Sequence, residues 1–179
     1  MSVLYDQLLD FLINNVSIDN IKQLSKSKKV NQEMIDALWQ ITISNSHPAS
    51  WRAAWTMHHL INDDNLELAR PHLHKMLDQL NLFNHNGQKR EIMKIILLFD
   101  PQDIDMGKAL NLSFDILINP SEALAVRVHA MQLIYNISNI ETELKHELRN
   151  TLEIIMQEES PAIRGRGKMI LKKLKKEGY

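Results

Sequence analysis

Aromatic, basic and imidazole side chains gather in one short segment, which reads WRAAWTMHH from Trp51 to His59. Trp51 and Trp55 are four residues apart, so on a helix they share one side with His58. Large aromatic side chains most often fill a core, and that is the first interpretation. The second is an accessible patch in which the indoles and Arg52 contact a partner or an unstacked base. The sequence leaves both interpretations open.

Eight histidines raise the question of a bound metal ion. His58 and His59 are adjacent, so on a helix they point about 100° apart and do not readily grip one ion. No two histidines lie four residues apart, no H-E-x-x-H motif occurs, and the chain has no cysteine for a thiolate site or a catalytic thiol. These spacings favour structural or surface histidines, and we predict no metal site.

Three further sequence patterns typical of catalytic or cofactor-binding sites are incomplete or absent. Asp100, Asp103 and Asp105 do not match the spacing of a calcium-binding EF-hand, and they favour capping of helix starts. The segment Gly165–Lys168 resembles part of a phosphate-binding loop, but Ala162 stands where that loop needs its first glycine. No G-x-S-x-G nucleophile motif occurs. The sequence therefore predicts no catalytic residue and no cofactor.

Charge is unevenly distributed although the chain as a whole carries a net charge of −1. Residues 161–179 hold seven basic residues and one acidic residue, a net of +6, so the rest of the chain carries −7. The overall balance excludes a chain that coats nucleic acid along its length. The basic end is typical of a solvated terminal helix, or of a site that docks phosphate, nucleic acid or an acidic protein.

Nothing in the sequence indicates export or membrane insertion. Asp6 and Asp10 interrupt the apolar residues near the N-terminus, which is unlike a signal peptide. The longest apolar run is Ile95–Phe99, and five residues are far fewer than the roughly 20 that cross a bilayer. We expect a cytoplasmic protein without membrane association.

The hydrophobic pattern is helical along nearly the whole chain, because apolar residues recur at steps of three and four. Short segments rich in Ser, Asn, Pro and Gly separate the periodic stretches. Pro71 lies inside one of these stretches and predicts a kink or a new helix start there. The predicted helices span 3–15, 17–27, 31–45, 48–62, 64–83, 87–99, 103–118, 121–138, 140–156 and 160–176.

Four of these helices repeat one another. Arg52, Arg90, Arg127 and Arg164 open them at intervals of 38, 37 and 37 residues, and each helix follows a turn. Apolar pairs follow at the sixth and seventh positions after the last three arginines. A period of this length predicts stacked helical hairpins, in which each hairpin hides its apolar side against the next.

The pattern V/I-R-x-x-small-x-x-L-L after a Pro, Asn or Ser turn resembles the second helix of a HEAT-like, armadillo-type repeat. The resemblance covers residues 31–176 as four hairpins, with residues 1–30 as an N-terminal capping hairpin. It implies an all-α fold, namely a right-handed α-solenoid of about five hairpins, in a single domain spanning 1–179. The turns carry Asn86, Asn119 and Ser160 where HEAT-like families usually place an Asp beside the Arg.

The resemblance also implies that the second helices line the concave side of the stack. Arginines there either clasp carboxylates or phosphates, or bind carbonyls of the preceding turn and hold the stack together. The candidate binding residues are those on the second helices that are aromatic, basic or imidazole: Trp51, Arg52, Trp55, Arg90, Lys94, Arg127, His129, Arg164 and Arg166.

As a whole the chain is similar to a small group of bacterial HEAT-like proteins of unassigned function, some of which carry the label adenylosuccinate lyase. The S-S-x-M-P-x-K catalytic loop of that lyase family has no counterpart here, which argues against the activity. We therefore predict a non-catalytic scaffold that binds another protein through its concave surface. The alternative is a nucleic-acid-binding protein related to HEAT-like DNA alkylation-repair glycosylases, using the basic C-terminal end.

Overall fold

The computed structural model describes residues 3–26, 30–158 and 160–179, and within these ranges it contains ten α-helices and no strand. The all-α prediction is confirmed. The parts of the predicted capping hairpin and of the last predicted turn that fall on residues 1–2, 27–29 and 159 lie outside the described residues. The α-helices are α1 Val3–Asp10, α2 Ile18–Lys26, α3 Gln32–Ile43, α4 Ala49–Leu60, α5 Leu73–Gln79, α6 Asn86–Ile96, α7 Met106–Ile118, α8 Leu124–Ser138, α9 Leu144–Glu158 and α10 Pro161–Lys176.

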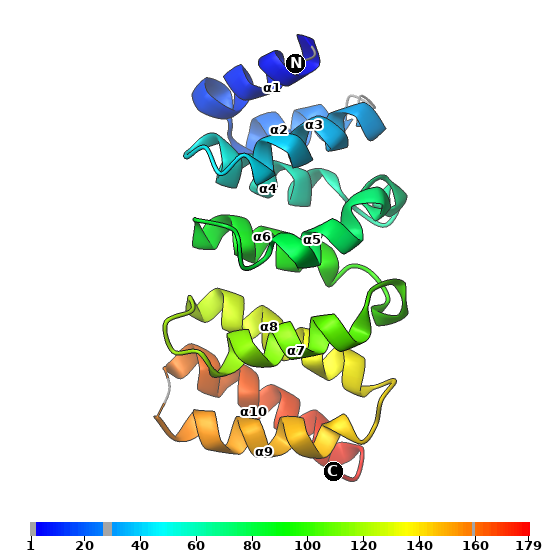
Figure 1. Cartoon of the computed structure of the whole chain (residues 1–179), viewed down its shortest axis with the longest axis vertical. Helices are drawn as coiled ribbons and strands as arrows, with labels where there is room; N and C mark the ends of the chain where they lie inside the picture. The colour runs from blue at the N-terminus through cyan, green and yellow to red at the C-terminus, as the bar shows by residue number, and fades with distance from the viewer. Residues whose placement is uncertain (1–2, 27–29, 159) are drawn as a thin grey trace. The chain divides into compact units, whose positions relative to one another are not determined.

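The chain forms two compact units, Met1–Leu98 and Phe99–Tyr179, which we call unit 1 and unit 2. In unit 1 the helices α3 and α4 pack as a hairpin, α1 packs on α3, and α4 lies between α2 and α6 (Figure 1). The core of this unit includes Leu38, Trp39 and Met57, each at most 1% exposed. Trp39 therefore fills the core of this hairpin, as large aromatic side chains most often do.

Unit 2 repeats the same packing with α7 to α10. Helices α7 and α8 form one hairpin, α9 and α10 form the next, and α10 also packs on α8. Gly167 of α10 lies against Met156 of α9, where a Cβ atom would collide with the Met156 side chain. The predicted pairing of helices into hairpins therefore holds for α3 with α4, α7 with α8 and α9 with α10. The N-terminal capping hairpin and the single-domain organisation over 1–179 stay predictions.

Two of the predicted helices are not continuous α-helices, and the other boundaries shift by up to four residues. The helix predicted over 64–83 is divided into two 3-10 turns, Leu66–Leu68 and Arg70–His72, followed by α5. Pro71 sits in the first turn of the second segment, because its ring fits a helix start and its missing N–H forbids a helix interior. The helix predicted over 3–15 ends as α at Asp10 and continues as a π-helical turn, Phe11–Asn15.

The acidic cluster in unit 2 caps helix starts, as its spacing favoured. The Asp100 carboxylate accepts a hydrogen bond from the backbone N–H of Gln102 at 2.8 Å, and Asp105 accepts one from Lys108 at 2.9 Å. Each carboxylate satisfies an N–H that has no partner within its own helix. Ser160 caps α10 in the same way through the N–H of Ile163.

Candidate functional site

Helix α4 leaves one narrow strip accessible. Trp51, Arg52, Trp55, His58 and His59 are half-buried, and every other residue of the helix is buried. Small residues (Ala49, Ala53 and Ala54) account for part of that buried side, which lets α3 and α6 approach closely. The accessible strip of this helix is therefore made entirely of indoles, imidazoles and one guanidinium.

Ring contacts hold both indoles in place. The Trp51 ring stacks on His85, with ring centres 5.7 Å apart, and His85 in turn lies 5.2 Å from His47. The Trp55 ring lies 4.8 Å from His59. Burial, together with His47 and Arg90, lowers the pKa of His85. An imidazole that stays neutral near pH 7 stacks on indole without bringing a charge into the site.

Helix α6 contributes two cations beside this strip, and a buried carboxylate anchors them. Glu91 is fully buried, and its carboxylate lies 2.8 Å from Arg90, 3.0 Å from Lys94 and 3.0 Å from His58 Nδ1. Burial alone would raise the pKa of the Glu91 carboxyl. Hydrogen bonds from His58, Lys94 and Arg90 outweigh burial and lower the pKa to about 2.

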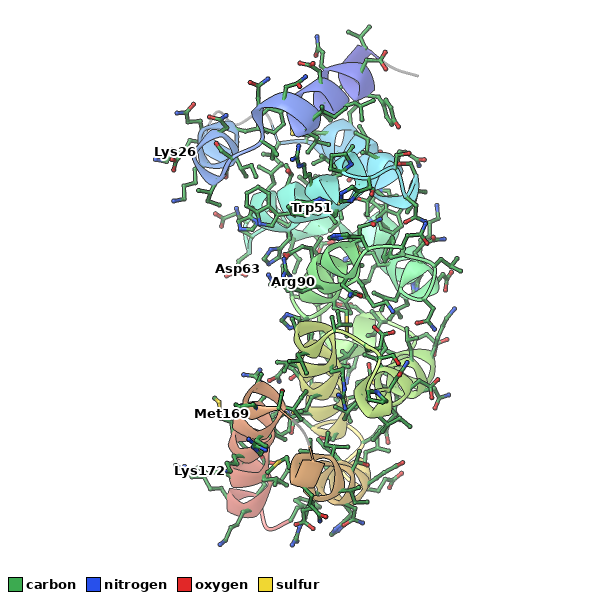
Figure 2. The ribbon with its side chains drawn as sticks, turned by 90° about the vertical axis from the view of Figure 1, so that its left-hand side faces the viewer. Lys26, Trp51, Asp63, Arg90, Met169 and Lys172 are labelled. Carbon is green, nitrogen blue, oxygen red and sulfur yellow. The ribbon has the colours of Figure 1, made fainter. Side chains whose placement is uncertain are left out.

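Figure 2 shows Trp51 and Arg90 on the same side of unit 1, one from α4 and the other from α6. We call the accessible residues here the unit 1 strip. Its members are Trp51, Arg52, Trp55, His58 and His59 of α4 with Arg90 and Lys94 of α6. The structure thus brings together five of the nine residues that the sequence nominated.

Arg52 has a structural duty as well. Its guanidinium donates hydrogen bonds to the carbonyl oxygens of Leu12 and Ile13, at 2.9 and 2.8 Å. These carbonyls belong to the π-helical turn after α1, whose last C=O groups lack partners of their own. Arg52 therefore fastens the first hairpin to the second, which is one of the two roles the sequence left open.

The remaining candidates lie in unit 2 and are dispersed. Arg127 is only 1% exposed, and its Nε donates to the carbonyl oxygen of Leu117 at 2.8 Å, at the end of α7. A side chain this buried does not line an accessible surface, so Arg127 has the structural one of the two roles that the sequence left open, in which the guanidinium binds a carbonyl close to the preceding turn. Arg166 donates to Gln132, His129 is half-buried, and Arg164 is exposed.

Comparison with protein families assigns the chain to one of them. The model of the HEAT repeat domain matches residues 8–174, nearly the full length. The chain belongs to the HEAT repeat family. Among curated proteins and among solved structures, no significant match is found.

In this HEAT repeat protein the recurring arginines Arg52 and Arg127 donate hydrogen bonds to backbone carbonyl oxygens. Among residues 3–26, 30–158 and 160–179, no three His, Asp or Glu side chains are placed to hold a metal ion. Within the same ranges, no helix combines the length and apolar character that a membrane span requires. A cytoplasmic location stays a prediction.

Sequence reasoning missed Glu91, the residue that organises the unit 1 strip. Its signal is its helical phase: it lies four residues before buried Ile95 and three after buried Gln88, on the apolar side of α6. A carboxylate at that phase, with Arg90 beside it and Lys94 three residues later, indicates a buried and compensated charge.

Proposed function

We propose that the protein is a non-catalytic HEAT repeat scaffold that binds another protein through the unit 1 strip. The observation that carries this proposal is on α4, where both indoles are half-buried and belong to the one accessible strip of the helix. Trp and Arg dominate the binding energy of protein interfaces, particularly where neighbouring groups exclude water from them. Fixed rings also lose little entropy on binding, because His85 and His59 already hold the indoles.

The charges of the strip favour a protein over a polyphosphate. Glu91 stays ionised and offsets one of the three cations of the unit 1 strip, Arg52, Arg90 and Lys94, so these groups leave a net of about two positive charges near pH 7. The Arg52 guanidinium is engaged with two carbonyl oxygens. A segment with apolar side chains and one or two carboxylates matches this surface better than a nucleic-acid backbone does.

The test compares a strip variant with a matched control in the same unit. Trp51→Ala combined with Trp55→Ala removes both indoles, while Leu82→Ala removes an apolar side chain that is 59% exposed elsewhere in unit 1. Partner proteins captured from a lysate by the wild type and by L82A should bind the double variant at least about tenfold more weakly. Circular dichroism confirms that all three proteins are folded. Equal capture by the double variant contradicts the proposal.

The accessible indoles beside Arg90 also bear on the alternative, nucleic-acid binding, because bases stack on aromatic rings. Fluorescence anisotropy with labelled single-stranded and duplex DNA, at low and at moderate salt, separates the two functions. We expect no binding to either DNA. If DNA binds, if the affinity falls steeply with salt, and if W51A/W55A abolishes the binding, then the unit 1 strip is a nucleic-acid-binding surface. An assay for fumarate release tests the lyase label directly, and we expect no release.

A further inference from the structure

Helix α9 carries an outward row of side chains that is acidic at one end and apolar at the other. Glu143, in the turn before α9, is followed by Glu147, Asn150 and Ile154 at steps of four, three and four residues. All four are exposed, and Ile154, at 68%, is the most exposed large apolar side chain among the described residues of unit 2. We call this row the α9 stripe.

Helix α10 carries a second outward row with the opposite character. Gly165, Met169, Lys172 and Lys176 follow one another at steps of four, three and four residues, and all are exposed. Met169 is 57% exposed. Figure 2 shows Met169 and Lys172 projecting on the same side of the helix. We call this row the α10 stripe; it is small and apolar at its start and basic at its end.

The two glycines of α10 differ in what surrounds them. Gly167 is explained inside the chain, because a Cβ there would collide with Met156. Gly165 is exposed, and a Cβ there would meet nothing within 4 Å. Glycine in a helix interior is about 1 kcal/mol less favourable than alanine, so Gly165 weakens α10 without improving its internal packing. A glycine on an outer surface does allow another helix to approach the backbone closely.

The geometry points to one occupant, a second copy of this chain: we propose that the α9 stripe of one copy packs antiparallel on the α10 stripe of another. The equal spacing of the two rows sets a register that pairs both glutamates with lysines and the exposed isoleucine with the exposed glycine. The pairs are Glu143 with Lys176, Glu147 with Lys172, Asn150 with Met169, and Ile154 with Gly165.

Each half of this register has a physical reason. The two Glu–Lys pairs join opposite charges that lie on exposed surfaces of the separate copies. Ile154 covers the gap over Gly165 and lies next to Met169, so that the two most exposed large apolar side chains of this hairpin leave water together. A nucleic-acid backbone or a lipid headgroup satisfies the lysines but offers no partner for the apolar half.

The two stripes face away from each other within one copy. Leu152 and Met156 of α9 contact the position of Gly167 on α10, which places the contact between the two helices there. Ile154 lies two residues from Leu152 and Met156, and Gly165 lies two residues from Gly167. Two residues correspond to about 200° around a helix, so both residues are on the far side of their helices from the α9–α10 contact. The association is therefore heterologous, and each copy in a pair keeps one stripe for a further copy. We expect concentration-dependent chains or rings instead of a closed dimer.

Sedimentation velocity of the full chain over a range of concentrations tests the pairing. The wild type should associate at about 0.05 M salt and dissociate at about 0.5 M, where surface charges are screened. Glu143→Lys with Glu147→Lys should abolish association, and so should Lys172→Glu with Lys176→Glu. An equimolar mixture of the two variants should associate again, because each then offers a stripe that complements the other. A wild type that stays monomeric at low salt, or a mixture that stays monomeric, overturns the proposal.

Gly165→Leu separates association from folding. The added side chain meets no neighbour in its own copy, so the variant should unfold no more easily than the wild type. It should associate at least about tenfold more weakly, because the leucine occupies the place of Ile154 of the other copy. Lys22→Glu with Lys26→Glu on α2 is the control for Lys172→Glu with Lys176→Glu, because it changes the net charge by the same amount away from both stripes. This control variant should associate like the wild type. Unchanged association of G165L contradicts the proposed contact.

Discussion

The arginines that open the second helices occupy equivalent repeat positions, yet units 1 and 2 use them differently. In unit 1, Arg52 reaches carbonyls of the π-helical turn after α1, and Arg90 pairs with the buried carboxylate of Glu91. In unit 2, Arg127 is buried on a carbonyl of its own hairpin, and Arg164 is exposed. The repeat fixes the position of the arginine on its helix. The neighbouring groups decide whether its guanidinium pairs with a carboxylate, binds backbone carbonyls or stays in solvent.

The largest difference between equivalent arginines should appear on removing Arg127. Arg127→Ala leaves a cavity and an unpaired buried carbonyl, which together should destabilise unit 2 by about 3 kcal/mol. Arg164→Ala, at the matching position of α10, should change stability by less than about 0.5 kcal/mol. Urea unfolding of both variants measures the contrast. Similar losses of unfolding free energy in the two variants would contradict the burial of Arg127 and its hydrogen bond to Leu117.

The carboxylate in unit 1 should show itself in the pH dependence of stability. The pKa of Glu91 in the folded protein is about 2, below its ordinary value of 4.5. Its contribution is therefore present above about pH 4.5 and is lost as the pH falls from there toward 2. Glu91→Gln should cost about 3 kcal/mol at pH 6, because it leaves Arg90 and Lys94 without their counter-charge. The difference between E91Q and the wild type should shrink at pH 3, and a constant difference would argue against an ionised Glu91.

The two glycines of α10 offer a smaller contrast within unit 2. Gly165→Ala should stabilise the protein by about 0.5–1 kcal/mol, since it improves helix propensity at an open position. Gly167→Ala should be at least about 1 kcal/mol less stable than G165A, because the new methyl group must displace Met156. Thermal unfolding ranks the two. Equal stabilities would show that Met156 shifts without cost.

The smallest expected effect concerns a network at the end of unit 2. The Tyr135 hydroxyl donates to Glu177 at 2.7 Å, and Lys145 lies 2.6 Å from the other carboxylate oxygen of Glu177. Hydrogen bonds from Lys145 and Tyr135 lower the pKa of Glu177. Tyr135→Phe should cost about 0.5–1 kcal/mol, the typical net worth of one hydrogen bond. Denaturant unfolding of Y135F beside the wild type measures this loss.

Period and turn chemistry predicted much of the fold, because they depend on residues that are near in sequence. The spacing of Arg52, Arg90, Arg127 and Arg164 placed the second helices within a few residues, and Pro71 marked the break before α5. Burial of individual charges was not predictable in this way. Whether Arg127 reaches solvent depends on how closely α7 and α8 approach, which no local pattern records.

The site shows the same division. Trp51, Trp55 and Arg90 were identified from residue type and helical phase, and the structure places them in the unit 1 strip. Glu91 escaped notice because an acidic residue between basic ones reads as part of a solvated surface. Its role depends on His58 from another helix, a contact between residues 33 positions apart.

Every tryptophan of the chain lies against a histidine ring: Trp39 against His72, Trp51 against His85 and Trp55 against His59. Indole emission depends on what lies against the ring, so the intrinsic tryptophan fluorescence of the protein should follow disruption of these ring pairs without any added label. Since all three tryptophans belong to unit 1, a denaturant titration followed at tryptophan emission reports on that half of the chain alone.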